Sequence, residues 1–210
     1  MGYGGLGLYQ KFVRPFVKYK PEKYWLKRGK VYRKRFQNSE AAQNQEKKLL
    51  DFLKQIKFET VLEFGCGFGR ISKLMLDNFQ IKQYKGFDLS PHQIDSAIKL
   101  CEKFSNASFE VKKMQDFNSN KKFDLVIGAE VLMHVPPTEI NDVTFRLSGY
   151  AKNHVVNIDW YVDTPPKKRI ANPHDFLHQY EKIYKKIPTV KSVERIPFSN
   201  NGSIFHATMK

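Results

Sequence analysis

The sequence VLEFGCGFGR, residues 61–70, decides the fold of this chain. Residues 60–64 form a short apolar run with a β-branched start, which is typical of a buried strand. Three glycines follow at once, at every second position, and residues 71–76 return apolar side chains at helical spacing. The stretch therefore predicts a strand, a glycine loop and a helix. Glycines let the backbone approach a ligand closely, and the start of the helix offers unpaired amides to it.

An acid follows at the distance that a nucleotide-binding fold requires. Residues 83–87 predict a second strand that ends in Asp88, 19 residues after the last loop glycine. A carboxylate at this point can accept hydrogen bonds from both hydroxyls of a ribose. The alternative is an Asp that caps the next helix. We disfavour it because Ser90, Pro91 and Gln93 already predict a capping box there.

VLEFGCGFGR resembles the first motif of class I S-adenosylmethionine-dependent methyltransferases, whose glycine loop wraps the methionine part of the cofactor. The GxGxG spacing and the acid Glu63 distinguish it from dinucleotide-binding loops. FDLVIGAEVLMHVPP, residues 123–137, resembles the fourth-strand motif of the same family. The resemblance covers about residues 40–210. It implies a Rossmann-like α/β fold, with a seven-stranded, mostly parallel sheet, helices on both faces and an antiparallel last strand.

The resemblance implies S-adenosyl-L-methionine as the cofactor. In the family an arm before the core shields the methionine end with aromatic groups and pairs its carboxylate with an Arg; plain packing of an amphipathic helix is the alternative for residues 23–36. The loop after the third strand holds the adenine; a loop acid beside a core Phe is the alternative there. The residues expected to contact the cofactor are Trp25, Arg28, Glu63, Gly65, Cys66, Gly67, Arg70, Asp88, Leu89, Gln93, Asp116, Phe117, Ala129, Glu130 and Val131.

The candidate catalytic residues follow the fourth and fifth strands. Methyl transfer from a sulfonium needs mainly alignment and exclusion of water, and a base only where the acceptor must lose a proton. His134 is the first candidate base because an imidazole titrates near neutrality; a histidine satisfied by the backbone is the alternative. Asp159, at the carboxyl end of the fifth strand, and His174, in the insert after it, complete the set. No residue cluster predicts a metal site.

Elimination narrows the acceptor. The sequence has no Asn- or Asp-Pro-Pro-aromatic loop after the fourth strand, which enzymes acting on base or glutamine amino groups carry, and no Cys placed for cytosine C5 chemistry. We expect transfer to O or N of a small metabolite, sugar or lipid-linked glycan. HDFLHQYEKIY, residues 174–184, is similar to inserts of type 11/12-like methyltransferases. The alternatives are an RNA-modifying methyltransferase and a cofactor-binding scaffold without catalysis.

The net charge of +15 is concentrated at the two ends of the chain. Residues 1–40 hold 11 Lys and Arg against 2 acids, and residues 165–210 hold 9 against 3, whereas residues 41–164 are balanced. Basic ends favour an anionic partner, which could be RNA, a membrane surface contacted peripherally, or an anionic acceptor held by the basic run 167–169. A solvated, solubilising surface is the alternative.

We expect a basic, aromatic arm and lid over residues 1–38 and a methyltransferase domain over 39–210, with an insert and helix at 165–188. The two cysteines lack metal-ligand spacing, no apolar stretch is long enough to span a membrane, and no signal-peptide pattern is present, which together predict a cytoplasmic protein. Helices are expected over 40–56, 91–103, 138–149 and 174–186, and closing strands over 190–196 and 203–209.

Overall fold

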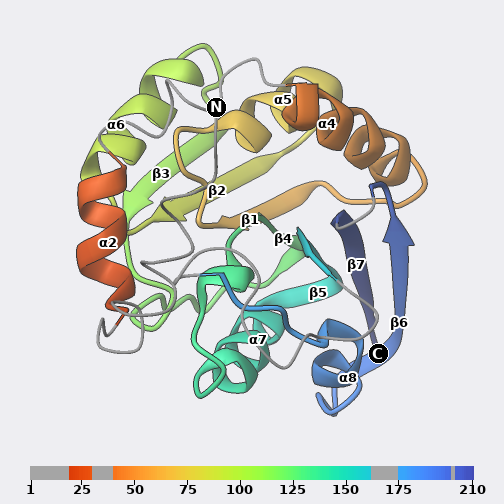
Figure 1. The fold of residues 1–210 in the computed structure, drawn as a ribbon. Helices are drawn as coiled ribbons and strands as arrows, with labels where there is room; N and C mark the ends of the chain where they lie inside the picture. Colours follow the sequence, from red (N-terminus) through yellow and green to blue (C-terminus); the bar gives the residue numbers. More distant parts are fainter. Residues whose placement is uncertain (1–18, 30–39, 162–174, 200–201) are drawn as a thin grey trace.

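The computed structural model of the chain describes residues 19–29, 40–161, 175–199 and 202–210. Its centre is a seven-stranded sheet with the order β3-β2-β1-β4-β5-β7-β6 (Figure 1). The strands are β1 (Thr60–Phe64), β2 (Gln83–Asp88), β3 (Ala107–Val111), β4 (Phe123–Ala129), β5 (Ala151–Trp160), β6 (Val190–Pro197) and β7 (Gly202–Met209). The first five strands are parallel, and β7 runs antiparallel to both of its neighbours. The predicted fold class is confirmed.

Helices cover both faces of this sheet (Figure 1). They are α2 (Pro21–Arg28), α4 (Glu40–Leu53), α5 (Arg70–Asn78), α6 (Pro91–Leu100), α7 (Ile140–Gly149), α8 (Tyr180–Tyr184) and a 3-10 turn, η3 (Leu132–His134). α4 and α5 pack on one face, whereas α7 and α8 pack on the other. Within the described ranges, no helix combines the length and the apolar character needed to cross a membrane.

The strands divide their side chains between two apolar layers. Successive side chains of a strand point to opposite faces of the sheet. Leu125 and Ile127 of β4 therefore join the layer under α4 and α5, while Val126 joins the layer under α7 and α8. Each is fully buried, which stabilises the fold by roughly 1.5–3 kcal/mol per side chain. Burial on both faces explains the unbroken apolar run that marked β4 in the sequence.

The helix expected over 174–186 is wrong in extent, because α8 spans only Tyr180–Tyr184. Residues 175–179 lie against η3 instead. The Phe176 amide donates to the Met133 carbonyl at 2.7 Å, and the His178 ring donates to the Val135 carbonyl at 2.9 Å. These tertiary bonds replace the helical hydrogen bonds that the sequence pattern predicted.

The capping box expected at the start of α6 is also wrong. Ser90 occupies the N-cap position without a side-chain hydrogen bond, and the side-chain amide of Gln93 donates to the Gly29 carbonyl at 2.5 Å. α2 lies beside α6 (Figure 1), so close that a Cβ on Gly29 would lie 2.2 Å from the Ser90 hydroxyl. The packing of α2 therefore engages both side chains that the sequence assigned to the cap. The helical spacing of apolar residues over 91–103 also predicts that Ile98 faces the core, but its side chain is 48% exposed.

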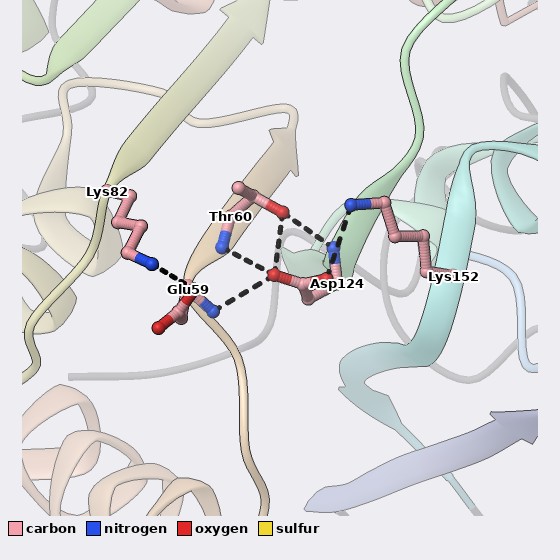
Figure 2. A network of polar contacts seen from close by, with 5 residues as sticks. All are labelled: Glu59, Thr60, Lys82, Asp124 and Lys152. Carbon is pink, nitrogen blue, oxygen red and sulfur yellow. Dashed lines mark hydrogen bonds and ion pairs between the residues drawn. The ribbon is translucent and has the colours of Figure 1, made fainter.

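A polar network fixes the starts of β1, β4 and β5, at the edge of the sheet opposite the glycine loop (Figure 2). Asp124 Oδ2 accepts hydrogen bonds from the Thr60 hydroxyl at 2.8 Å and from the amides of Thr60 and Glu59 at 2.9 and 3.1 Å. Lys152 lies 3.5 Å from the other oxygen, and Lys82 pairs with Glu59 at 2.7 Å. Burial disfavours the Asp124 charge, but the hydrogen bonds outweigh burial and lower the pKa of this carboxyl. The network holds the strand register that positions the loops at the other edge.

Candidate functional site

A cavity of about 920 Å³ lies where the carboxyl ends of the parallel strands meet α2. Pockets for small molecules usually measure roughly 300–1,000 Å³, so this cavity lies near the upper end of that range. Every residue expected to contact the cofactor lines it, except Phe117. The sequence motifs and the cavity therefore coincide.

The glycine loop needs its glycines for two physical reasons. Gly65, Gly67 and Gly69 have φ values of 61°, 55° and 88°, in the left-handed region that glycine adopts without a steric penalty. A Cβ on Gly65 would also lie 2.6 Å from a methyl group of Val131. The loop can thus turn sharply while the segment after β4 packs directly on it.

Asp88, which is expected to bind the ribose, is held by two backbone amides. Its Oδ2 accepts a hydrogen bond from the Gly67 amide at 3.1 Å, and its Oδ1 accepts one from the Ser90 amide at 2.8 Å. Burial raises the pKa of the carboxyl, and these amides act in the opposite direction. A carboxylate offers about four lone-pair positions, so Asp88 retains acceptor capacity for the two hydroxyls of a ribose.

Glu63 lies at the base of the cavity with a strongly perturbed pKa. Burial raises this pKa to about 7, against hydrogen bonds from Ser72 and Tyr84 that lower it. Both hydroxyls donate to the same oxygen, Oε2, with Tyr84 at 2.6 Å. The neighbouring Cys66 is buried, and burial raises the pKa of its thiol well above the ordinary value. Near neutral pH, Cys66 is therefore a neutral thiol and Glu63 a carboxyl close to its midpoint.

Glu130 has a strained backbone at the turn after β4. With φ at 58°, it is the one non-glycine residue of positive φ in the described ranges. Gln45 of α4 donates to its carboxylate at 3.3 Å and accepts from Arg70 at 2.6 Å. Arg70 also pairs with Glu46 at 3.0 Å. A strained backbone persists only where the surrounding structure holds it, and such residues cluster at functional sites. Here side chains of α4 and α5 hold Glu130.

Three buried polar atoms on the cavity wall test whether a polar cofactor fits. Arg28 Nε, Ser90 Oγ and Gln93 Oε1 have no hydrogen-bond partner within the part of the chain that is described. Leaving such an atom unsatisfied costs about 1–3 kcal/mol. A bound molecule that carries a carboxylate and hydroxyl groups would satisfy these atoms, so the site fits S-adenosylmethionine.

α2 closes the cavity from outside. The Trp25 ring lies 4.6 Å from the His134 ring, and its indole N–H donates to the Tyr19 hydroxyl at 3.1 Å. Glu22, one turn earlier, pairs with Lys113 of the loop after β3 at 2.9 Å. Since no residue of α2 is itself buried, this helix is attached mainly through the walls of the cavity. Residues of α2 line the cavity, and the arm and lid expected over residues 1–38 remain a prediction.

His134 lies on the cavity wall beside Asp175, which was not predicted as a site residue. Its Nδ1 is 3.3 Å from Asp175 Oδ1, and both side chains are largely buried, at 13% and 7% exposure. The neighbouring His174, expected to be catalytic, falls outside the described residues. No local signal in the sequence pairs His134 with Asp175, because the contact depends on how residues 175–179 return to η3.

Asp159 lies behind η3 instead of on the cavity wall. It is buried and accepts hydrogen bonds from the side-chain amide of Asn157 at 2.9 Å and from the backbone amide of Met133 at 3.3 Å. The second bond attaches Asp159 to the turn that carries His134. Burial raises its pKa to about 7. In this position Asp159 can orient η3, and its assignment as a catalytic residue remains a prediction.

Phe117 lies in the core, as in the alternative interpretation of its loop. Its ring stacks on Phe87 with centroids 4.3 Å apart, whereas its neighbour Asp116 lines the cavity. The cavity wall also includes Trp160, which directly follows Asp159 and was not predicted as a site residue. The described residues contain no group of three or more His, Cys, Asp and Glu side chains that could hold a metal ion.

Comparisons with known proteins agree with this geometry. A family model described as a methyltransferase domain matches residues 61–153. Malonyl-[acyl-carrier protein] O-methyltransferase 1 of Ilyobacter polytropus is 32% identical over 68 residues, which are 32% of this chain and 25% of that protein. The corresponding enzyme of Acetivibrio thermocellus is 32% identical over 68 residues, 24% of its length. The aligned part of the chain thus spans about a quarter of the length of these relatives.

Solved structures share the fold over most of the chain. Magnesium protoporphyrin IX methyltransferase of Synechocystis PCC 6803, with bound S-adenosylmethionine, has a TM-score of 0.69 at 16% identity and covers 92% of this chain and 99% of its own. The N-methyltransferase NodS of Bradyrhizobium japonicum WM9, with bound S-adenosylhomocysteine, has a TM-score of 0.71 at 17% identity, covering 90% and 99%. These structures share the fold that the family resemblance implies, and the family model over residues 61–153 supports the resemblance itself.

Proposed function

We propose, from the premise that residues 61–153 form a class I S-adenosylmethionine-dependent methyltransferase domain, that this chain transfers a methyl group to O or N of a small acceptor. The observation that carries the proposal is the cavity itself. It joins Asp88 and the glycine loop on one side to His134 and Asp175 on the other. A cofactor held by the first group would present its reactive end to an acceptor beside the second.

The chain holds the cofactor through groups already oriented toward the cavity. Asp88 takes the ribose, Asp116 the adenine, and the Arg28 guanidinium the methionine carboxylate. S-adenosylmethionine supplies an activated methyl group on a sulfonium, so the protein contributes alignment and exclusion of water. α2, with Trp25, forms the roof that keeps water out.

His134 removes the proton of the acceptor when the acceptor must lose one. Asp175 faces Nδ1, fixes the tautomer of the ring and stabilises the imidazolium that forms, as a carboxylate beside a general base does in hydrolases. Asp159 holds the backbone of η3, on which His134 sits. The acceptor and His134 thus lie on the same wall, at the carboxyl ends of β4 and β5.

The chemical nature of the acceptor and the atom that is methylated are separate parts of the proposal. Preference for an anionic acceptor was inferred from the basic run 167–169, which lies outside the described residues. The relatives are named as O-methyltransferases and one structural neighbour as an N-methyltransferase, so either atom is compatible with the family. A glycan acceptor, RNA, peripheral membrane contact, a cytoplasmic location and a scaffold without catalysis remain predictions without a specific supporting contact.

Calorimetry tests the cofactor half of the proposal. The protein should bind S-adenosylhomocysteine, and Asp88→Ala should weaken binding by about 1.5–3 kcal/mol, the contribution of hydrogen bonds to a charged group. Asp95→Ala is the control, because Asp95 is exposed on α6 and does not line the cavity. Binding of a nicotinamide dinucleotide in place of S-adenosylhomocysteine would contradict the proposal. Labelled S-adenosylmethionine, incubated with fractionated cell extract, then shows whether the methyl group enters small molecules, lipid, RNA or protein.

Variants of the His134–Asp175 pair test the catalytic half. His134→Ala should lower kcat by roughly 10²–10⁴-fold while S-adenosylhomocysteine affinity stays close to that of the wild type, since a base acts in the transition state. Asp175→Asn should lower kcat less than His134→Ala does, because the imidazole that takes the proton remains and only the carboxylate beside its Nδ1 is lost. Wild-type turnover in both variants would place the acceptor elsewhere.

A further inference from the structure

The cavity wall is divided by charge along the chain. Its cationic side chains, Arg28, Arg70, Lys112 and Lys113, all come from α2, α5 and the loop after β3, which is the half assigned to the cofactor. From Ala129 onward, the described wall residues include no Lys or Arg. They include three carboxylates, Glu130, Glu139 and Asp175, whereas the wall residues before Ala129 carry four carboxylates beside their four cations. Among the described residues, the part of the wall from Ala129 onward is therefore acidic.

Aromatic groups accompany these carboxylates. The chain has two Trp residues, and both line the cavity. Trp160 stands at the carboxyl end of β5 and is 39% exposed, although a large apolar ring gains free energy by burial. Trp25 approaches from α2 and contacts the His134 ring. Indole rings bind cations over their faces more strongly than other aromatic side chains do, and carboxylates nearby strengthen the attraction.

We propose that the acceptor of this site is an amine that arrives as an ammonium cation and is held between Trp160 and the carboxylates of Glu130 and Asp175. This inference rests on the proposed function. His134 takes one proton from the ammonium group, and the freed nitrogen lone pair forms the new N–C bond. The C–S bond breaks with its electron pair going to sulfur, which turns the sulfonium into a neutral thioether. The product is a methylated ammonium ion, so charge and atoms balance.

Binding to the S-adenosylhomocysteine-saturated protein tests the inference without an identified acceptor. The probes are choline, its uncharged analogue of the same shape, 3,3-dimethyl-1-butanol, and the anion 3,3-dimethylbutanoate, measured by calorimetry. Choline should bind most tightly and the anion least. Trp160→Leu should weaken choline binding by about 2- to 30-fold, the range of cation–π strengths, and leave the alcohol almost unaffected. Glu130→Gln should act in the same direction.

A matched control separates the changes in choline affinity from a general loss of protein stability. Phe145→Leu makes a comparable aromatic-to-aliphatic change at an exposed site on α7 away from the cavity, and should alter neither choline nor S-adenosylhomocysteine binding. Equal affinity for choline and the alcohol, tighter binding of the anion, or an unchanged choline affinity in Trp160→Leu would overturn the inference and leave the proposed function in place. Failure of the wild-type protein to bind S-adenosylhomocysteine would overturn both.

Discussion

At the scale of single residues, the space beside Gly65 is filled by the side chain of Val131. A Cβ at this position would lie 2.6 and 2.7 Å from the two Val131 methyl groups, in a backbone conformation with φ of 61°. Gly65→Ala should therefore destabilise the protein through two separate causes, a clash and about 1–3 kcal/mol of backbone strain. Urea unfolding measures the total, and calorimetry measures the loss of S-adenosylhomocysteine affinity.

Two further variants separate these causes. Adding Val131→Ala to Gly65→Ala removes the clashing methyl groups, so the double variant should recover part of the lost stability relative to the sum of the single variants. Gly149→Ala is the matched control, because nothing lies within 4 Å of a Cβ placed there. Additive single effects in the double variant would show that Val131 does not restrict Gly65.

The same residue scale shows what the sequence could reveal about the site. Gly65, Gly67 and Asp88 were predicted because their chemistry is encoded by spacing within short segments. Asp175 was missed as the partner of His134, since the two are brought together only by the return of a later segment to η3. Long-range contacts of this kind leave no local pattern.

At the scale of elements, α2 joins the domain through contacts around the cofactor cavity. It buries no residue of its own, and its Gly29 carbonyl accepts the Gln93 amide beside Asp88. Deleting residues 1–38 should therefore leave a folded domain with weaker S-adenosylhomocysteine affinity. Circular dichroism and calorimetry measure the two effects. If affinity is unchanged, and cofactor addition to the full chain leaves the accessibility of Trp25 unchanged, the arm is not a lid.

Tertiary contacts override the local secondary-structure propensity of the sequence at two of the helices. Strands β1 and β4 were predicted from short apolar stretches, because a strand buried on both faces leaves a nearly continuous apolar pattern. The cap of α6 and the length of α8 were not, because Gly29 packs against Ser90 and residues 175–179 bond to η3. In both cases a tertiary hydrogen bond replaced the local one that the sequence favours.

At the scale of the whole molecule, two buried groups make the stability depend on pH in opposite directions. Burial lowers the pKa of His178 from 6.5 to about 4, so the unfolded chain binds this proton more readily and stability rises with pH between these values. Burial raises the pKa of Asp159 from 3.8 to about 7, so the folded chain binds this proton more readily and stability falls as pH rises through that range. The two contributions offset each other between about pH 4 and 6.5.

Single variants should expose the contributions that cancel in the wild type. We expect the stability of the wild type relative to His178→Asn to rise by about 3 kcal/mol from pH 4 to 6.5, since one pKa unit corresponds to about 1.4 kcal/mol. By the same conversion, its stability relative to Asp159→Asn should fall by about 4 kcal/mol between pH 4 and 7. Urea unfolding at half-unit pH steps measures both differences, each against the wild type in the same buffer. If the two stability differences changed with pH in the same direction, one of the two groups would not hold the protonation state that its burial favours. Asp159 could then no longer be regarded as a largely neutral support for the turn that carries His134.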